Sequence, residues 1–502
     1  MSEPIIIDWL AHHGQHRGDA LAAIDIGTGR RWTYRQFHDR VARLGAALRD
    51  KYGVRPGDRV MTVTRGSTDV YEILFAAWRI GAVFMPINWR LAPPELAAIA
   101  ADGEPSLIIA DAEFQSIVPA GPWRTMVRTP GDQTSEYERA IAGTAPDFDF
   151  YAATLDTMNT LLYTSGTTGV PKGVIGTWRM TMLIVLQSAV SAQLGPDCVT
   201  LTAAPLFHTA GLNSYAMPLF HFGGALAVMA SWDAATCLKL LSDPTLRVTH
   251  TLGVPTQYLL MSRLPEFAAA TFPTIRMAAC GGAPATEDLL DTWAQKGLRL
   301  TSGYGMTEVF GVCSVSAEIA RRKPRAAGTP AMYTEIRIAD EEGRSCPLGT
   351  VGEIQLKSPG VTPGYWRQPE ATRAAFIAGW FRTGDLGYFD EEGLLFLVDR
   401  KKDMFISGGE NVYPAEVENV FAGFPEVGQV AVIGVPDPQW GEVGKAVVVA
   451  RPGQNVDEAT LLARCTGKIA KFKIPKSVAV VEALPLSAQG KVLKVELRKR
   501  FA

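Results

Sequence analysis

The chain has 502 residues, a formal net charge of -2 and 47% hydrophobic residues. At ~150 residues per domain, this length fits roughly three folding units, and the hydrophobic content excludes a chain that is disordered throughout. The balanced charge excludes a global field that would draw the protein onto nucleic acid or an anionic membrane.

The N-terminal sequence MSEPIIIDWL has no basic region and no small-residue cleavage site, so we do not expect a signal peptide. The most apolar stretch, residues 180–192, is shorter than the ~20 residues that span a bilayer. We therefore expect a buried helix there and no stable membrane insertion. The six cysteines are scattered and form no CxxC pair, which fits a reducing cytoplasm better than a disulfide framework or a zinc site.

Helix and strand patterns alternate over the first ~250 residues. Thr33 and Gln36 form a capping-box pattern ahead of an apolar helical face at Phe37, Val41, Leu44 and Leu48. Short apolar strands are expected at residues 60–63 and 107–109, with a helix containing Ile73, Leu74, Phe75 and Trp78 between them. This alternation predicts a mixed α/β fold with parallel strands buried on both faces.

The pattern changes at about residue 328, where short alternating strands such as 335–338 begin. Two near-identical acidic turns, 340–343 and 390–393, predict hairpin connections in a small β-barrel-like subdomain. After residue 400 a helix at 415–421 and a strand at 430–435 predict a separate α+β domain. We therefore expect an N-terminal domain over 1–399, with an α/β part over 1–327 and a β part over 328–399, and a mobile C-terminal domain over 400–502.

Residues 163–174, YTSGTTGVPKGV, follow an apolar strand pattern at 159–163 and precede a helix pattern. Glycine lets the backbone approach a ligand closely, and successive N–H groups in such a loop form an anion-binding concavity. Lys172 adds a positive charge. The segment does not match G-x-x-x-x-G-K-[ST], so it predicts phosphate binding of another class than that of the P-loop kinases and GTPases.

This segment resembles the signature loop of the adenylate-forming superfamily, which includes acyl- and aryl-CoA synthetases, luciferases and nonribosomal-peptide adenylation domains. Further motifs follow in the family's order over essentially the whole chain. These are PLFHTAG at 205–211, ACGGAP at 279–284, GYGMTE at 303–308, WFRTGDL at 380–386, DRKKD at 399–403, SGGENVYP at 407–414 and PLSAQGK at 485–491. Among members of this superfamily, the chain resembles the 4-coumarate/feruloyl-CoA ligases and the medium-chain acyl-CoA synthetases more than the very-long-chain enzymes.

The resemblance implies a role for each motif residue. The implied catalytic residues are Lys491, Glu308, Thr307 and His208, with Glu308 also binding Mg²⁺. The implied ATP-binding residues are Thr164, Ser165, Gly166, Thr167, Thr168, Gly169, Lys172, Gly282, Ala283, Pro284, Tyr304, Asp385 and Arg400. Lys402 is the implied hinge, Gly408 and Gly409 line the implied coenzyme A channel, and the implied acyl pocket contains His208, Gly211, Gly281, Gly305 and Phe310.

Two departures from the family pattern stand out. Leu486 and Ser487 occupy positions where an Arg-Thr pair is more usual, and no histidine lies near Thr177 and Trp178. Neither departure removes a residue to which the resemblance assigns chemistry, because Gly490 and Lys491 are both present.

These motifs predict a cytoplasmic acid–thiol ligase that uses ATP, Mg²⁺ and coenzyme A and acts on a hydroxycinnamate-like or medium-chain acid. Three alternatives stay open: a luciferase-like oxygenase, a stand-alone amino- or aryl-acid adenylation enzyme, and a nonenzymatic nucleotide-binding regulator. The entrance segment 207–210 has no carboxylate to meet an α-ammonium group, which counts against an amino acid substrate. A homodimer is common among relatives, and no nucleic-acid partner is expected.

Overall fold

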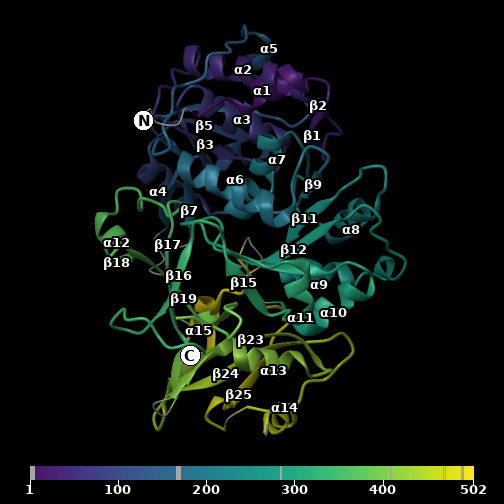
Figure 1. Cartoon of the computed structure of the whole chain (residues 1–502), viewed down its shortest axis with the longest axis vertical. Helices are drawn as coiled ribbons and strands as arrows, with labels where there is room; N and C mark the ends of the chain where they lie inside the picture. Colours follow the sequence, from purple (N-terminus) through teal and green to yellow (C-terminus); the bar gives the residue numbers. More distant parts are fainter. Residues whose placement is uncertain are drawn as a thin grey trace.

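The computed structural model describes residues 6–164, 171–282, 285–401, 403–407, 410–466, 468–469, 471–487 and 491–501. Figure 1 shows the chain progressing from the N-terminal residues at the top to the C-terminal residues at the bottom. The described strands form three sheets, two of them within the first 400 residues and the third within the last hundred.

A six-stranded sheet carries the segment on either side of the predicted phosphate loop. Its order is β6 (Arg124–Arg128), β5 (Pro105–Asp111), β3 (Arg59–Val63), β4 (Val83–Pro86), β7 (Met158–Thr164) and β8 (Lys172–Thr177). The first five strands are parallel, and β8 pairs antiparallel with β7. The sequence predicted a helix directly after the loop, but strand β8 comes first and the helix α6 (Trp178–Ala192) follows it.

A second sheet has fourteen strands and runs from a parallel half into an antiparallel half. The parallel half contains β1 (Leu21–Asp25), β10 (Ala225–Val228), β9 (Val199–Thr202), β11 (His250–Gly253), β12 (Met277–Gly281) and β13 (Leu300–Tyr304), with β2 (Arg31–Thr33) antiparallel at its edge. The antiparallel half contains β14 (Cys313–Ser314), β15 (Ala326–Pro330), β20 (Leu395–Arg400), β19 (Trp380–Phe389), β17 (Gly352–Lys357), β16 (Glu335–Ala339) and β18 (Phe376–Ile377).

This continuity refines the prediction for residues 328–399. The mixed α/β fold is confirmed, but the described strands of this region form no closed barrel and instead extend the parallel sheet through β14. The β13–β14 pairing turns the chain antiparallel at Gly303 and Tyr304. As a consequence, the end of the parallel half and the start of the antiparallel half meet at the motif 303–308.

The helices of the N-terminal 400 residues pack around these two sheets. They are α1 (Trp9–His16), α2 (Tyr34–Asp50), α3 (Thr68–Arg79), α4 (Pro93–Gly103), α5 (Glu136–Ala142), α6, α7 (Ala216–Phe222), α8 (Ala234–Ser242), α9 (Pro255–Ser262), α10 (Glu287–Gln295), α11 (Ala317–Arg322) and α12 (Pro369–Ala374). The predicted capping box is present, since Thr33 and Gln36 exchange their side-chain and backbone hydrogen bonds at the start of α2. The apolar face of α2 is buried at Phe37, Val41 and Leu44.

Helix α6 differs in part from its prediction as a buried helix. One face, including Met180, Ile184 and Val185, is buried, whereas Val190 is 71% exposed. The helix covers the core with a single stripe, so its high hydrophobicity does not mean burial all round. Among the described residues, none of the helices has both the length and the apolarity to span a bilayer.

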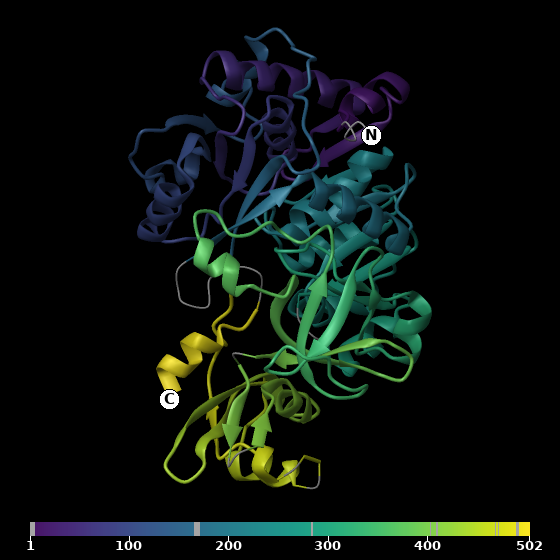
Figure 2. The same cartoon turned by 60° about the vertical axis from the view of Figure 1, so that its left-hand side comes forward.

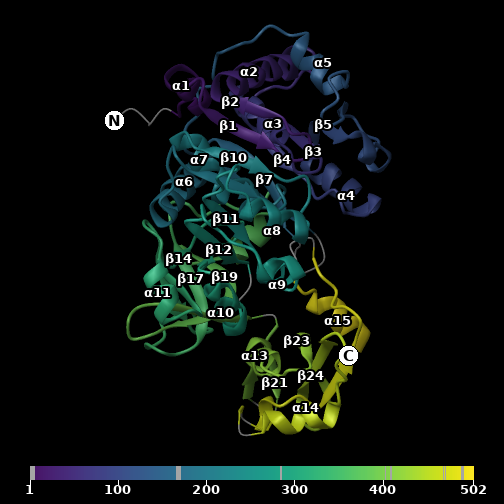
Figure 3. The same cartoon turned by 90° about the vertical axis from the view of Figure 1, so that its right-hand side faces the viewer.

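The last hundred residues form a separate sheet with its own apolar core. It contains β22 (Glu410–Val412), β21 (Phe405–Ser407), β24 (Gly441–Ala450), β23 (Val427–Asp437) and β25 (Ser477–Val480), with helices α13 (Pro414–Ala422), α14 (Glu458–Cys465) and α15 (Lys494–Phe501). Figures 2 and 3 show the yellow chain just before α15 rising from this sheet toward the middle of the molecule. That ascending segment carries Lys491.

Candidate functional site

Lys491 comes from the C-terminal end of the chain but lies against the N-terminal part. A Cβ atom built on Gly282 would lie 3.4 Å from the Cε atom of Lys491 and 3.9 Å from its Nζ atom. Gly282 follows strand β12 and has a φ of +80°, a conformation that glycine adopts without strain. The structure therefore brings Lys491 of the last motif beside Gly282 of the motif at 279–284, although 209 positions of sequence separate the two residues.

The loop that carries Lys491 is closed by hydrogen bonds on either side of it. The Ser487 amide donates to the Lys491 carbonyl over 2.7 Å, and the Lys491 amide donates to the Ser487 hydroxyl over 3.2 Å. Leu486 and Val492 form an antiparallel bridge. Serine at 487, one of the two departures from the family pattern, therefore supplies an acceptor that orients the backbone of Lys491.

His208 lies near the same lysine, in the turn before the π-helical segment Ala210–Ser214. Burial, together with the positive charges of Lys491 and Arg90, lowers the pKa of its imidazole to about 3. The imidazole is therefore neutral near pH 7. In the same segment Gly211 has no room for a side chain, because a Cβ atom there would lie 2.4 Å from the Pro205 carbonyl oxygen.

Tyr304, Asp385 and Arg400 form a chain of polar contacts at the junction of the two halves of the large sheet. The Tyr304 hydroxyl donates to Asp385 Oδ2 over 2.6 Å, and Arg400 Nε lies 3.2 Å from Asp385 Oδ1. Strands β19 and β20 place Asp385 directly opposite Arg400 in register. Tyr304 ends β13 and is 8% exposed, while burial raises the pKa of its hydroxyl well above its usual range.

Glu308 lies close to these three contacting residues and is 9% exposed. Burial raises the pKa of its carboxyl, a hydrogen bond from Tyr365 lowers it, and the charges of Arg400 and Asp385 also act on it. Among the described residues no Lys, Arg or His nitrogen forms an ion pair with Glu308. A buried carboxylate without a cationic side-chain partner is a group that a hard cation such as Mg²⁺ fits.

Lys172, at the start of β8, is linked to Glu308 through an aromatic side chain. Its Nζ atom lies 5.0 Å from the centre of the Tyr365 ring, and the Tyr365 hydroxyl donates to Glu308 Oε1 over 2.9 Å. Thr164 ends the preceding strand, with its hydroxyl 3.4 Å from the Lys172 carbonyl oxygen. Sequence reasoning did not identify Tyr365, which has no charge and no periodic pattern to mark it.

The remaining predicted residues divide into those that the structure places and those that lie outside its described part. Gly281 ends β12, and Thr307 follows the turn after β13. Gly305 packs so closely that a Cβ atom would lie 2.1 Å from the Phe310 carbonyl oxygen, and Phe310 itself is buried with a φ of +61°. The predicted residues outside the described part are Ser165, Gly166, Thr167, Thr168, Gly169, Ala283, Pro284, Lys402, Gly408 and Gly409.

Comparisons with known proteins agree with this arrangement of motifs. Residues 10–366 match the AMP-binding enzyme family, and residues 416–491 match the AMP-binding enzyme C-terminal domain. The chain is 41% identical over 470 residues to a feruloyl-CoA synthase of Amycolatopsis, covering 93% of this chain and 94% of that protein.

Two solved structures are similar over nearly the whole chain. The ATP-bound MatB structure from Rhodopseudomonas palustris has a TM-score of 0.90 and 32% identity, with 96% of each chain covered. The o-succinylbenzoate CoA synthetase of Bacillus subtilis, in complex with an acyl-adenylate intermediate, has a TM-score of 0.88 and 29% identity, with 99% of this chain and 98% of that chain covered.

Proposed function

Because the chain belongs to the AMP-binding enzyme family, we propose that it is an AMP-forming acid–thiol ligase, which joins a carboxylic acid to coenzyme A through an acyl-adenylate. The observation that carries this proposal is the position of Lys491 near His208 and beside Gly282, in the motif 279–284 that resembles part of the family's ATP site. A remote lysine inserted into a nucleotide site supports chemistry at that site better than nucleotide binding alone, which distinguishes the enzyme from a nucleotide-binding regulator.

The first half-reaction makes the acid a good acylating agent. A carboxylate oxygen attacks the α-phosphorus of ATP, a new P–O bond forms, and the bond from that phosphorus to the pyrophosphate oxygen breaks. The transition state carries negative charge on phosphate oxygens, so positioning and prearranged positive charge provide the catalysis. In this proposal the Lys491 ammonium contacts both the α-phosphate and the attacking carboxylate.

The other residues bind and orient the nucleotide in this proposal. Lys172 and Thr164, with the segment 165–169, hold the β- and γ-phosphates, and Thr307 contacts phosphate. Asp385 accepts hydrogen bonds from the ribose hydroxyls, since a carboxylate can accept several at once, and Arg400 and Tyr304 hold that carboxylate in place. The adenine lies against Tyr304 and the segment 282–284.

Glu308 is the proposed Mg²⁺ ligand. Its carboxylate is buried and forms no ion pair with a described residue, and Mg²⁺ usually takes one or two carboxylates together with substrate phosphates. Bound there, Mg²⁺ supplies positive charge beside the phosphate oxygens. Glu308 fixes where that charge sits relative to Lys172.

In the second half-reaction the sulfur of coenzyme A attacks the acyl carbonyl carbon, the C–O bond to AMP breaks, and the thiol proton is released. We propose that the C-terminal domain, residues 400–502, turns about Lys402 for this step. The turn withdraws Lys491 and brings in Gly408 and Gly409 beside the thiol. Closure of this kind protects a hydrolysable intermediate from water.

The acid is proposed to be aromatic and hydroxycinnamate-like, with a medium-chain acid as the second candidate. The named activity of the Amycolatopsis relative supports the aromatic class. His208, Gly211, Gly281, Gly305 and Phe310 are the proposed acyl-pocket residues, and the neutral His208 suits a pocket for an uncharged acyl group. A panel of cinnamates and C6 to C18 fatty acids, scored by coenzyme A-dependent AMP release, tests this class; a preference for C16 or longer would contradict it.

The proposed location is the cytoplasm, which fits the six free cysteines. The proposed assembly is a homodimer, and light scattering on the purified protein tests it. Neither the location nor the oligomeric state affects the two proposed half-reactions.

The decisive experiment follows the nucleotide product. The parent is expected to release AMP and pyrophosphate, not ADP, and to catalyse acid-dependent ATP–pyrophosphate exchange. Lys491→Ala should slow that exchange by roughly 100-fold or more, because it removes a positive charge aimed at the transition state. Lys499→Ala, a largely exposed lysine on the next helix, is the matched control and should leave exchange unchanged. Release of ADP, or an equally fast Lys491→Ala variant, would overturn the proposal.

A further inference from the structure

Residues 362–366 form a strap that connects two parts of the site which the sequence keeps far apart. On one side, the Trp366 amide donates to the Gly173 carbonyl over 2.7 Å, and Val174 forms an antiparallel bridge with Tyr365. On the other side, the Thr362 amide donates to the Glu308 carbonyl over 2.7 Å. The strap therefore lies between the β7–β8 hairpin and the loop after β13.

The strap is itself held in place by hydrogen bonds to strand β8 and within the strap. The Thr362 hydroxyl donates to the Ile175 carbonyl over 2.7 Å and lies 2.9 Å from the Gly364 carbonyl oxygen. The Ile175 amide donates to the Gly364 carbonyl over 3.2 Å. Thr362 is 2% exposed, so these bonds are shielded from water. The backbone of residue 365 is consequently fixed against the start of β8.

From this backbone, the side chain of Tyr365 reaches both charged groups of the proposed phosphate site. Its ring lies 5.0 Å from the Lys172 Nζ atom, a distance at which an ammonium is attracted to an aromatic face. Its hydroxyl donates to Glu308 Oε1 over 2.9 Å. One side chain thus spans a cation at the start of strand β8 and an anion in the loop after strand β13.

We propose that Tyr365 is a positioning residue for the first half-reaction: it fixes the Glu308 carboxylate, and with it the bound divalent cation, relative to Lys172. The inference deepens the proposed function and rests on it for the identity of the nucleotide site. A carboxylate can rotate about its terminal bond, and a hydrogen bond to one oxygen orients the other toward a metal.

The test uses Tyr365→Phe, which keeps the ring over Lys172 and removes only the hydroxyl. Mn²⁺ binding to the protein–ATP complex, without any acid, is measured by electron paramagnetic resonance. We expect Tyr365→Phe to weaken Mn²⁺ binding roughly 10-fold, the scale of one lost hydrogen bond to a charged group. The Mg²⁺ concentration for half-maximal ATP–pyrophosphate exchange should rise by a similar factor, while the KM for ATP at saturating Mg²⁺ stays unchanged.

Two further variants distinguish the effect of the Tyr365 hydroxyl from the effect of its ring and from a general loss of stability. Tyr365→Leu should also raise the KM for ATP several-fold, because Lys172 loses its aromatic partner. Tyr388→Phe, on strand β19 where the ring stacks on Phe396, is the matched control and should behave as the parent in every assay. Thermal unfolding of all three variants identifies any that fold poorly, and the Mn²⁺ affinity is measured only on well-folded protein. If Tyr365→Phe folds poorly, Tyr365→Trp, which also lacks the hydroxyl, replaces it.

Unchanged Mn²⁺ affinity and an unchanged Mg²⁺ requirement in Tyr365→Phe would overturn the inference. Failure of the proposed function gives a different result, because the parent would then show no exchange with any acid while the Mn²⁺ measurement still reports on Tyr365. An equal loss of Mn²⁺ affinity in Tyr388→Phe would also contradict a specific role for Tyr365.

Discussion

His208 is held without charge by its surroundings, although it lies close to the centre of the proposed chemistry. Burial lowers its pKa to about 3, and Lys491 and Arg90 oppose a further positive charge nearby. Such a side chain cannot act as a proton donor near neutral pH. In the proposed function, His208 would therefore help to shape the acyl site, and Lys491 would contact the substrate carboxylate.

This low pKa has a measurable consequence for stability. In the unfolded chain the His208 imidazole has a pKa of about 6.5. Below that pH the unfolded state therefore binds a proton that the folded state does not bind. Stability is then fully present above about pH 6.5 and is lost as the pH falls toward 3. Between pH 7 and pH 5 the parent should lose about 2 kcal/mol more unfolding free energy than His208→Asn.

Urea unfolding of both proteins at the two pH values measures this difference. His221→Asn is a useful comparison, since burial and the charges of His13 and His12, rather than Lys491, lower the pKa of His221. Equal pH dependence in the parent and His208→Asn would show that His208 titrates normally in the folded protein.

Sequence alone could predict the charged residues of the site but not how neutral side chains connect them. Asp385, Arg400 and Glu308 follow from motif order, and the structure brings them together. Tyr365 could not be predicted, because its role depends on a strap that contacts two other loops. The positive φ of Phe310 depends likewise on its packing against Gly305.

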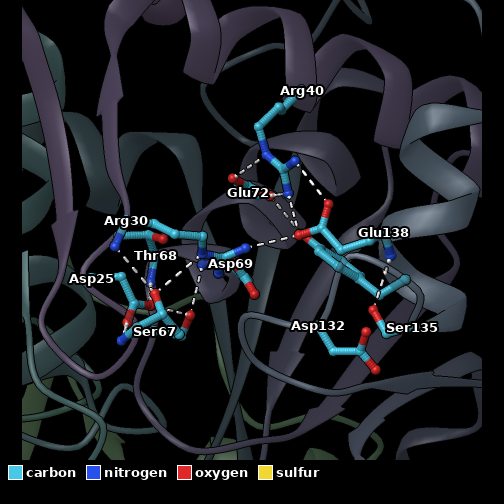
Figure 4. Close-up of polar contacts among 12 residues, drawn as sticks. Asp25, Arg30, Arg40, Ser67, Thr68, Asp69, Glu72, Asp132, Ser135 and Glu138 are labelled. Carbon is cyan, nitrogen blue, oxygen red and sulfur yellow. Dashed lines mark hydrogen bonds and ion pairs between the residues drawn. The ribbon is translucent and has the colours of Figure 1, made fainter.

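At the scale of whole elements, a buried ion network joins the two large sheets. Arg30 follows β1, Arg40 lies on α2, Asp69 and Glu72 lie on α3, and Glu138 lies on α5 (Figure 4). Arg40 contacts both oxygens of Glu72 and of Glu138 at 2.8–3.0 Å. Arg30 lies between two strands of the fourteen-stranded sheet, whereas α3 and α5 connect strands of the six-stranded sheet. Because Arg30 pairs with Asp69 and Glu138, the network links the two sheets.

We expect Arg40→Met to destabilise the protein by about 3–5 kcal/mol, because it leaves the buried Glu72 carboxylate without its cation and leaves Glu138 with Arg30 as its remaining ion-pair partner. Arg43→Met is the matched control on the same helix. The Arg43 side chain is 32% exposed and pairs with Asp39, which is 42% exposed, so its loss should cost no more than about 1 kcal/mol. Equal midpoints of urea unfolding for the two variants would contradict a structural role for the network.

The sequence predicted helices and turns correctly where the local residue pattern determines them. It failed where strand pairing between separate segments determines the structure. The capping box at Thr33 fixes the start of α2, and the acidic turns at 340–343 and 390–393 do lie between sequence-adjacent strands. Strand β8 was missed because residues 172–177 pair with β7 across the loop, a contact that periodicity does not reveal. The β region was predicted as a separate barrel because its connection through β14 is only two residues long.

At the scale of the whole molecule, the C-terminal sheet is placed so that Lys491 reaches the site. Two hydrogen bonds between described residues link the C-terminal sheet and its helix α13 to the N-terminal part. Asp399 accepts a hydrogen bond from the Ala415 amide over 2.9 Å, and the Arg263 side chain donates to the Gly428 carbonyl over 3.2 Å. In the proposed rotation of the C-terminal domain, each such contact shifts the balance between the two arrangements.

The Arg263–Gly428 contact is therefore expected to favour the arrangement with Lys491 inserted. Arg263→Ala removes one hydrogen bond worth about 1 kcal/mol, so the equilibrium ratio of the two arrangements should shift roughly 5-fold, and the population with Lys491 inserted should fall roughly 3-fold if both arrangements are of similar energy. ATP–pyrophosphate exchange should slow by up to that factor, whereas transfer of a supplied acyl-adenylate to coenzyme A should not slow at all. Arg276→Ala, which breaks an exposed pair with Asp197 inside the N-terminal part, should change neither rate. An equal loss in both half-reactions for Arg263→Ala would mean that the arginine supports the fold and not the position of the C-terminal domain.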